Sequence, residues 1–241
     1  MRGIPLHRAH ALRALALPAL LLAACTGLGA QQTRYSSSHF TVRAPAGHDM
    51  NPLLDELELA YRDVRSYGFA LPTMVQVRSY GTTAEFTRHS GGLAFHLAIA
   101  RDEFLHLQPL ATLMKSGELA RTLRHELAHV ALAGAAKRGL PRWLNEGMAM
   151  VVAGEHHPEE TRFRSLRQLD DTLARSRSRR ELRGAYGTAG RLVRRLVESH
   201  GKEKVLALLR TVGSQGKFEE AFSSFTGGSV KDWEKAELNR R

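Results

Sequence analysis

Two histidines and two glutamates stand close together in RHELAHVALAGAAKRGLPRWLNEGMAM, residues 124–150. His125 and His129 are four residues apart, so on a helix both imidazoles share one face and can point at one metal ion. Imidazole nitrogens bind Zn²⁺ at about 2.0–2.1 Å. Glu126 lies about 100° further round the helix, beside that ion. There it could take a proton from an attacking water and pass it to a leaving amine.

A zinc site with only two imidazoles is incomplete, because a catalytic site has three protein ligands and one open position. Glu146 can supply the third ligand, since a turn at 137–140 lets a second helix fold back beside the first. The alternative is a chance His-Glu-x-x-His in a helix with two solvated or core-paired histidines. The residues around the motif are apolar, and buried imidazoles without partners are costly, which favours the metal site. These neighbours are Leu119, Leu123, Leu127, Val130 and Ala131.

At HELAH and WLNEGMA the chain resembles the gluzincin zinc metallopeptidases, in particular the aminopeptidase N-like branch and its small peptidase-MA-like relatives. The resemblance implies that His125, His129 and Glu146 bind one Zn²⁺ in the cleft of a thermolysin-like catalytic domain. It also implies that Glu126 is the general base and acid. Sixteen residues separate the second histidine from the ligand glutamate, two fewer than in the aminopeptidases.

A second block, AYGTAGRLVRRLVESHGKEKVLALL at 185–209, resembles the tyrosine helix of the same family, with Tyr-x-x-x-Gly in place of Tyr-x-x-Gly. The resemblance implies that Tyr186 donates its hydroxyl to the oxyanion formed at the peptide carbonyl; the alternative is a core tyrosine. A strand expected at 91–100 matches the family's rim strand, which could take an extended substrate by strand addition. The Gly-Ala-Met-Glu-Asn segment that holds a substrate N-terminus is missing, so an endopeptidase or processing enzyme is favoured.

The elements that would position these residues predict an α+β domain, with a small N-terminal mixed sheet and helices followed by a mainly helical lobe. Alternating apolar and polar residues predict strands at 39–45, 73–80 and 91–100. Apolar residues at helical spacing predict the helices. These are expected at 51–64, 82–89, 118–135, 141–152, 186–199, 202–212 and 229–238.

The N-terminus has the pattern of a lipoprotein signal peptide at residues 1–24. A basic start precedes an apolar run at 14–24 that is too short to span a bilayer, and LAAC resembles the bacterial lipobox. Cys25 is the only cysteine, and lipid attachment would account for an odd thiol in an exported protein. Residues 25–38 would then be a lipidated tether. The alternative is an ordinary secretory signal cut near Ala30.

We therefore expect a catalytic domain at 39–241, in the bacterial cell envelope and anchored to a membrane through lipid on Cys25. Thr26 after the cysteine resembles the outer-membrane sorting signal of bacterial lipoproteins, which implies an outer membrane facing the periplasm. A soluble periplasmic or secreted form is the alternative. The formal charge is +11, and about +8 without the signal peptide. Export argues against nucleic acid as a partner, whereas anionic lipid headgroups or envelope polymers are within reach.

One arginine-rich segment and three further histidines are the remaining candidate functional residues. The segment 161–183 carries eight arginines, which indicate a solvated helix face or mobile loop, or contact with an anionic surface or substrate. His96, His156 and His157 are expected at the surface or in loops, because the site already has three ligands.

The sequence thus predicts a membrane-anchored zinc peptidase that hydrolyses a peptide or protein substrate. The alternative function is a non-catalytic zinc-binding envelope lipoprotein that serves as an assembly or binding module. The cleaved bond and the oligomeric state stay open.

Overall fold

The computed structural model describes residues 32–101, 103–136, 139–158 and 161–239. The expected signal peptide, the lipidation residue Cys25 and residues 25–31 of the expected tether lie outside the described residues. Within the described ranges, no helix is both long enough and apolar enough to cross a membrane.

In the described part of the chain, five strands form one mixed sheet in the order β1-β2-β3-β5-β4. The three central strands run parallel, and β1 and β4 pair antiparallel at the two edges. The strands are β1 (Gln32–Ser36), β2 (Phe40–Pro45), β3 (Val75–Ser79), β4 (Ala98–Arg101) and β5 (Phe104–Leu107). The predicted N-terminal mixed sheet is therefore confirmed.

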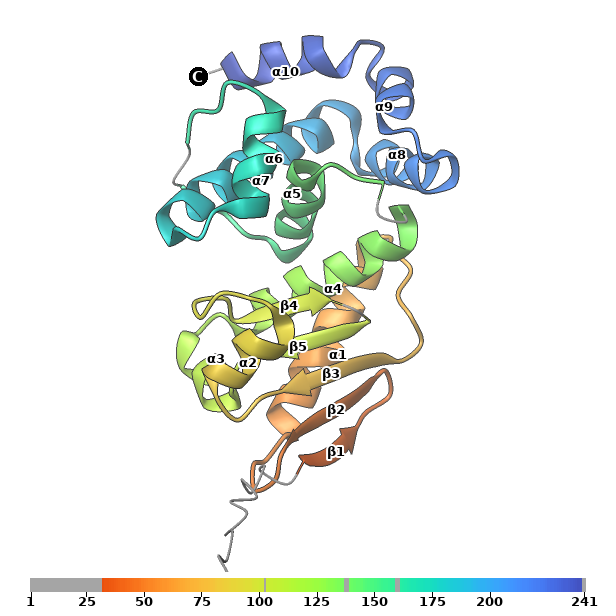
Figure 1. Ribbon diagram of the computed structural model, residues 1–241. Helices are drawn as coiled ribbons and strands as arrows, with labels where there is room; N and C mark the ends of the chain where they lie inside the picture. The colour runs from red at the N-terminus through yellow and green to blue at the C-terminus, as the bar shows by residue number, and fades with distance from the viewer. Residues whose placement is uncertain (1–31, 102, 137–138, 159–160, 240–241) are drawn as a thin grey trace, which may run out of the picture.

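The helices divide between a sheet lobe and a helical lobe, and α4 lies between the two (Figure 1). This long helix packs against α1 in the sheet lobe and against α5 and α8 in the helical lobe. The helices of the sheet lobe are α1 (Asn51–Ser66), α2 (Thr83–Ser90), α3 (Leu110–Ser116) and α4 (Leu119–Ala136). Those of the helical lobe are α5 (Arg142–Ala153), α6 (Leu166–Arg175), α7 (Arg179–His200), α8 (Lys202–Gln215), α9 (Phe218–Thr226) and α10 (Val230–Asn239).

The apolar residues of α4 explain its central place. Leu123, Leu127 and Leu132 are buried in a core that runs through both lobes. Fully burying a leucine side chain stabilises a fold by about 1.5–3 kcal/mol. His125, Glu126 and His129 on the same helix are only partly buried. Helix α4 therefore also contributes polar residues to the surface between the lobes.

Several elements of the structure differ from those expected from the sequence. Strand β1 lies inside the expected tether, so the sheet begins before residue 39. The strand expected at 91–100 is ordered as a strand only from Ala98, where pairing with β5 begins. Strand β5 and the helices α3 and α9 were not predicted, and α6 lies in the segment that was expected to be either a helix face or a loop. Helix α7 begins seven residues earlier than the expected 186.

Glu58 on α1 joins the first hairpin of the sheet to the helix behind it. Its Oε1 accepts hydrogen bonds from Ser37 Oγ (2.6 Å) and from the backbone N–H of His39 (2.8 Å). Its Oε2 lies 2.7 Å from His39 Nδ1. Burial alone would raise the pKa of Glu58, but the hydrogen bonds from Ser37 and His39 outweigh it and lower the pKa below 4.5.

A carboxyl with a lowered pKa stabilises the fold above its unfolded pKa, and this contribution is lost as the pH falls. We expect Glu58→Ala to lower the free energy of unfolding by about 1–3 kcal/mol at neutral pH. Below about pH 4.5 the difference from wild type should shrink, because the carboxyl of the wild-type protein becomes protonated. Urea denaturation across this pH range measures both effects. Glu56→Ala, which removes a carboxyl from the same helix, is the matched control, and a pH-independent loss in Glu58→Ala would contradict the assignment.

A candidate metal centre between the lobes

The three predicted metal ligands meet in the structure. Helix α4 places His125 and His129 one turn apart, and α5 brings Glu146 against them. The two Nε2 atoms are 3.1 Å apart. Glu146 Oε2 lies 3.6 Å from Nε2 of His125 and 3.3 Å from Nε2 of His129. These side chains are only 13 to 18% exposed.

The spacing of the three ligand atoms fits a tetrahedral ion. With bonds of about 2.0–2.1 Å, two ligand atoms at tetrahedral corners are separated by about 3.3–3.4 Å. The three observed separations, 3.1, 3.3 and 3.6 Å, lie on both sides of that value. Two imidazole nitrogens and one carboxylate oxygen are also a donor set that zinc accepts. The residues present therefore fit a zinc ion with one coordination position left for another ligand.

The electrostatics of the group favour positive charge at its centre. Burial would lower the pKa of His125 and His129, but the nearby carboxylates outweigh it and raise both pKa values. Burial would raise the pKa of Glu146, yet the two histidines hold its pKa well below the ordinary value. All three shifts show that the site favours positive charge, which a bound cation could supply.

Asn145 fixes the orientation of the second histidine. Its Oδ1 lies 2.6 Å from His129 Nδ1, the ring nitrogen that faces away from the ligand group. A proton on Nδ1, donated to this oxygen, leaves Nε2 as the free lone pair that a metal requires. Asn145 precedes Glu146 on α5, so one helical turn supplies both a ligand and the residue that orients another ligand.

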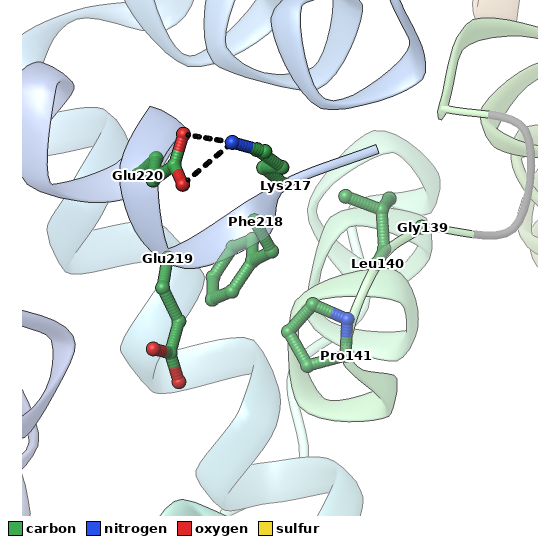
Figure 2. Close-up of a pocket in the computed structure, with 7 residues that line it drawn as sticks. All are labelled: Gly139, Leu140, Pro141, Lys217, Phe218, Glu219 and Glu220. Atoms are coloured by element: carbon green, nitrogen blue, oxygen red, sulfur yellow. Dashed lines mark hydrogen bonds and ion pairs between the residues drawn. The ribbon is translucent and has the colours of Figure 1, made fainter. Parts of the chain in front are cut away.

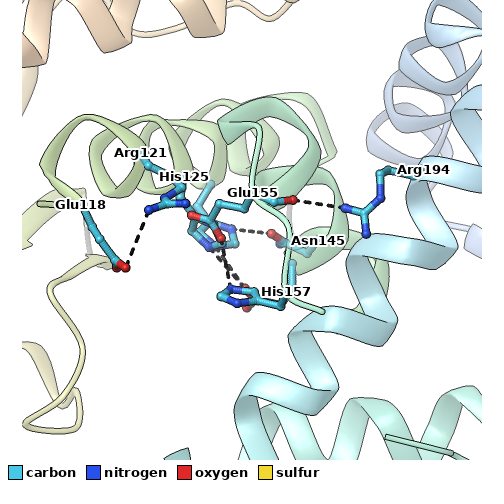
Figure 3. Close-up of polar contacts among 9 residues, drawn as sticks. Glu118, Arg121, His125, Asn145, Glu155, His157 and Arg194 are labelled. Atoms are coloured by element: carbon cyan, nitrogen blue, oxygen red, sulfur yellow. Dashed lines mark hydrogen bonds and ion pairs between the residues drawn. The ribbon is translucent and has the colours of Figure 1, made fainter. Parts of the chain in front are cut away.

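Glu155, which the sequence analysis did not single out, faces the other histidine (Figure 3). Its Oε1 lies 3.2 Å from His125 Nδ1, an ion-pair distance at which the atoms are not aligned for a hydrogen bond. Its Oε2 lies 3.7 Å from His157 Nε2. Burial would raise the pKa of Glu155, but His125 and His157 outweigh it and lower the pKa to about 2.

The backbone holds Glu155 in this position. Gly154 ends α5 in the left-handed conformation at φ 66°, which turns the chain back toward α4. The N–H of Glu155 then donates to Met150 O (2.8 Å), and its carbonyl accepts from Arg194 Nη1 (3.1 Å; Figure 3). The only feature of the sequence that could have pointed to Glu155 is its position directly after a glycine that ends a helix.

We expect Glu155→Gln to weaken the binding of added Zn²⁺ to this group by about 10- to 100-fold, the usual effect of losing a carboxylate beside a ligand histidine. Competition with a chromogenic chelator measures this affinity on the purified protein. Glu198→Gln, which changes an exposed glutamate on α7, is the matched control. Equal affinities of Glu155→Gln and wild type would contradict an orienting role.

Glu126 lies between the ligand group and the edge of the sheet. Its Oε2 accepts a hydrogen bond from the backbone N–H of Ala100 in β4 (2.7 Å). The sheet therefore holds Oε2 of Glu126, and Oε1 takes no part in that hydrogen bond.

Tyr186 reaches the site because α5 and α7 pack closely. A Cβ at Gly147 would come within 2.5 Å of Ala189 O and of Val193 Cγ2, so only glycine allows this approach of the α7 backbone. The ring of Tyr186 then lies perpendicular to that of His125, with centroids 6.5 Å apart. Burial, and then the surrounding glutamates, raise the pKa of Tyr186 well above 10, so its hydroxyl stays protonated.

These residues line one cavity of about 670 Å³. One side is formed by the segment from Phe95 to Ala100, which leads into β4, and the other by α5 and α7. His96 and His157 lie outside the helices and strands, as expected, and they also line this cavity. All five predicted catalytic and metal residues are on its surface; they are His125, Glu126, His129, Glu146 and Tyr186.

A second hollow lies between the turn before α5 and the start of α9 (Figure 2). Its charged side chains include Lys217 and Glu220, which pair with each other at 2.9 Å. In the chain as described, the one group of residues able to hold a metal ion is His125, His129 and Glu146. The chemistry is therefore expected at the larger cavity.

A scan against protein-family models found no match to the chain, and a search of curated proteins found none either. The function of the site is therefore inferred from its residues and their geometry.

Proposed function

We propose that this chain is a zinc metallopeptidase of the gluzincin type, with a thermolysin-like catalytic cleft between the sheet lobe and the helical lobe. The observation that carries the proposal is the tetrahedral spacing of the ligand atoms of His125, His129 and Glu146, with Glu126 beside them. When bound, zinc would polarise a substrate carbonyl and make water a better nucleophile at neutral pH.

Glu126 would move the protons of the reaction. The carboxylate oxygen that Ala100 does not hold could accept a proton from the attacking water. The same group, once protonated, would donate to the leaving amine. The hydrogen bond from Ala100 would keep the carboxylate oriented during both transfers.

Tyr186 would stabilise the negative charge on the substrate oxygen. Its hydroxyl is protonated, because burial and the neighbouring carboxylates raise its pKa. A neutral phenol that donates a hydrogen bond as charge develops on the substrate lowers the barrier without a proton transfer of its own.

The substrate would be an extended peptide lying along β4. This strand is at the edge of the sheet and pairs only with β5, and three of its residues, Ala98 to Ala100, line the cavity. An edge strand can pair with a peptide through backbone hydrogen bonds. Internal cleavage fits such pairing, and lipid on Cys25 would hold the enzyme at a membrane.

We expect the purified protein to bind one zinc ion per chain and to cleave members of a peptide library, with cleavage lost on chelation. Glu126→Gln should keep its zinc and lose at least 100-fold in cleavage rate, because proton transfer contributes about 10²–10⁴-fold. Atomic absorption and mass spectrometry of the library measure the two quantities. A wild-type rate in Glu126→Gln, or a protein without zinc, would contradict the proposal.

A second candidate is the non-catalytic zinc-binding module. The hydrogen bond between Glu126 and Ala100 favours it, because this bond also ties α4 to β4 and gives the glutamate a structural use. Under this alternative, zinc removal would lower the melting temperature while no library peptide is cleaved.

Tyr186→Phe separates the oxyanion role from a packing role. We expect kcat to fall about 100-fold with KM and zinc content unchanged, because the lost donor acts only in the transition state. Single-substrate kinetics and a thermal melt measure these effects. Tyr35→Phe, in the edge strand β1, is the control, and an unchanged kcat in Tyr186→Phe would leave Tyr186 a packing role only.

A further inference from the structure

The two sides of the cavity differ in charge. On the side of the sheet, the segment from Phe95 to Ala100 contributes apolar side chains and one histidine. On the helical side, three arginines line the same space: Arg142 at the start of α5, and Arg179 and Arg183 in the first turns of α7. Two of these three arginines belong to the segment 161–183. The sequence allowed two interpretations of that segment, a solvated face or loop and a contact with an anionic partner.

The acidic residues of the cavity already have partners. Glu146 contacts the two ligand histidines, and Glu155 contacts His125 and His157. Glu126 accepts from Ala100, and Glu118 pairs with Arg121 at 3.7 Å. None of these carboxylates forms an ion pair with Arg142 or Arg179 in the described part of the chain.

Arg142 and Arg179 have no carboxylate within ion-pair distance among the residues that the structure describes. Asp170 interacts electrostatically with Arg142, and its Oδ1 accepts a hydrogen bond from the backbone N–H of Trp143 (2.7 Å). Both arginines stand in the first turn of a helix, where the helix dipole disfavours a cation by about 0.3–1 kcal/mol. Helix stability therefore does not account for them.

Both arginines line the cavity that holds the ligand group. The guanidinium of Arg179 lies 5.5 Å from the centroid of the Phe95 ring, so it reaches across the cavity to the segment that leads into β4. Arg142, at the start of α5, lines the cavity together with Tyr186. A peptide lying along β4 would pass between these cations and the ligand group.

We propose that the cavity selects acidic peptides, with aspartate or glutamate side chains near the bond to be cut held by Arg142 and Arg179. This inference rests on the proposed function, because it names the substrate class of the same site. A guanidinium matches a carboxylate with two parallel hydrogen bonds, so an acidic side chain is preferred over its amide analogue.

The test compares two short fluorescent peptides that differ only in having glutamate or glutamine at the central positions. Binding is measured by anisotropy on zinc-loaded Glu126→Gln protein, which should bind peptides without cleaving them. We expect the glutamate peptide to bind about tenfold more tightly, and Arg142→Gln and Arg179→Gln each to reduce that preference about threefold. Added salt should weaken the preference, since exposed charges are screened.

Arg180→Gln is the matched control, because Arg180 is the next residue on α7, is exposed and does not line the cavity. We expect this variant to keep the preference of the parent protein. Equal binding of the two peptides, no binding of either, or an equal loss of preference in Arg180→Gln and Arg179→Gln would overturn the proposal.

The cleavage assay separates this inference from the proposed function. If the wild type cleaves neither peptide but the arginine-dependent preference persists, the peptidase proposal fails and the selectivity of the cavity stands. If the wild type cuts the glutamate and glutamine peptides at equal kcat/KM and binding shows no preference, the peptidase stands and the selectivity fails.

Discussion

The contact of Glu146 with His125 and His129 is the interaction on which the centre of this molecule depends. A carboxylate and two imidazoles with little exposure to water are stable only if their charges and lone pairs compensate one another. The separations of 3.1 to 3.6 Å achieve this, and they also leave a point equally near all three atoms. These distances require α4 and α5 to stay at a fixed spacing, and the surrounding contacts hold the two helices there.

Packing on the far side of α5 holds that separation. Trp143 is 1% exposed and stacks on Trp233 with ring centroids 5.2 Å apart, which anchors the start of α5 in the helical lobe. Gly147 lets the backbone of α7 approach the other side of the helix. The segment WLNEG therefore combines an anchor, a residue that orients His129, a ligand and a close helix contact within five positions. A change at either end of this segment would shift Glu146, although neither end contacts the histidines.

The sequence was sufficient for the parts of the fold that repeat a regular pattern. Six of the expected helices, from α1 to α10, agree with the structure within three residues at each end, and the three ligand residues meet as the spacing of the motif predicts. Edge strand β1 was not predicted because its residues alternate only between exposed and half-buried, and Tyr35 is its one large apolar side chain. Glu155 was not predicted because its contact with His125 depends on the turn at Gly154, and the direction of that turn is set by tertiary packing.

The sequence could not show which arginines line the cavity. Eight arginines in 161–183 are equivalent in the sequence, yet only Arg179 and Arg183 line the cavity, because the position of α7 against α5 decides which helix face meets the site. The same packing, permitted by Gly147, places Tyr186 beside His125 from the next turns of α7. One helix contact thus brings the proposed oxyanion donor and the cationic wall to the ligand group together. A change that displaced α7 would therefore alter the proposed catalysis and the charge of the cavity at once.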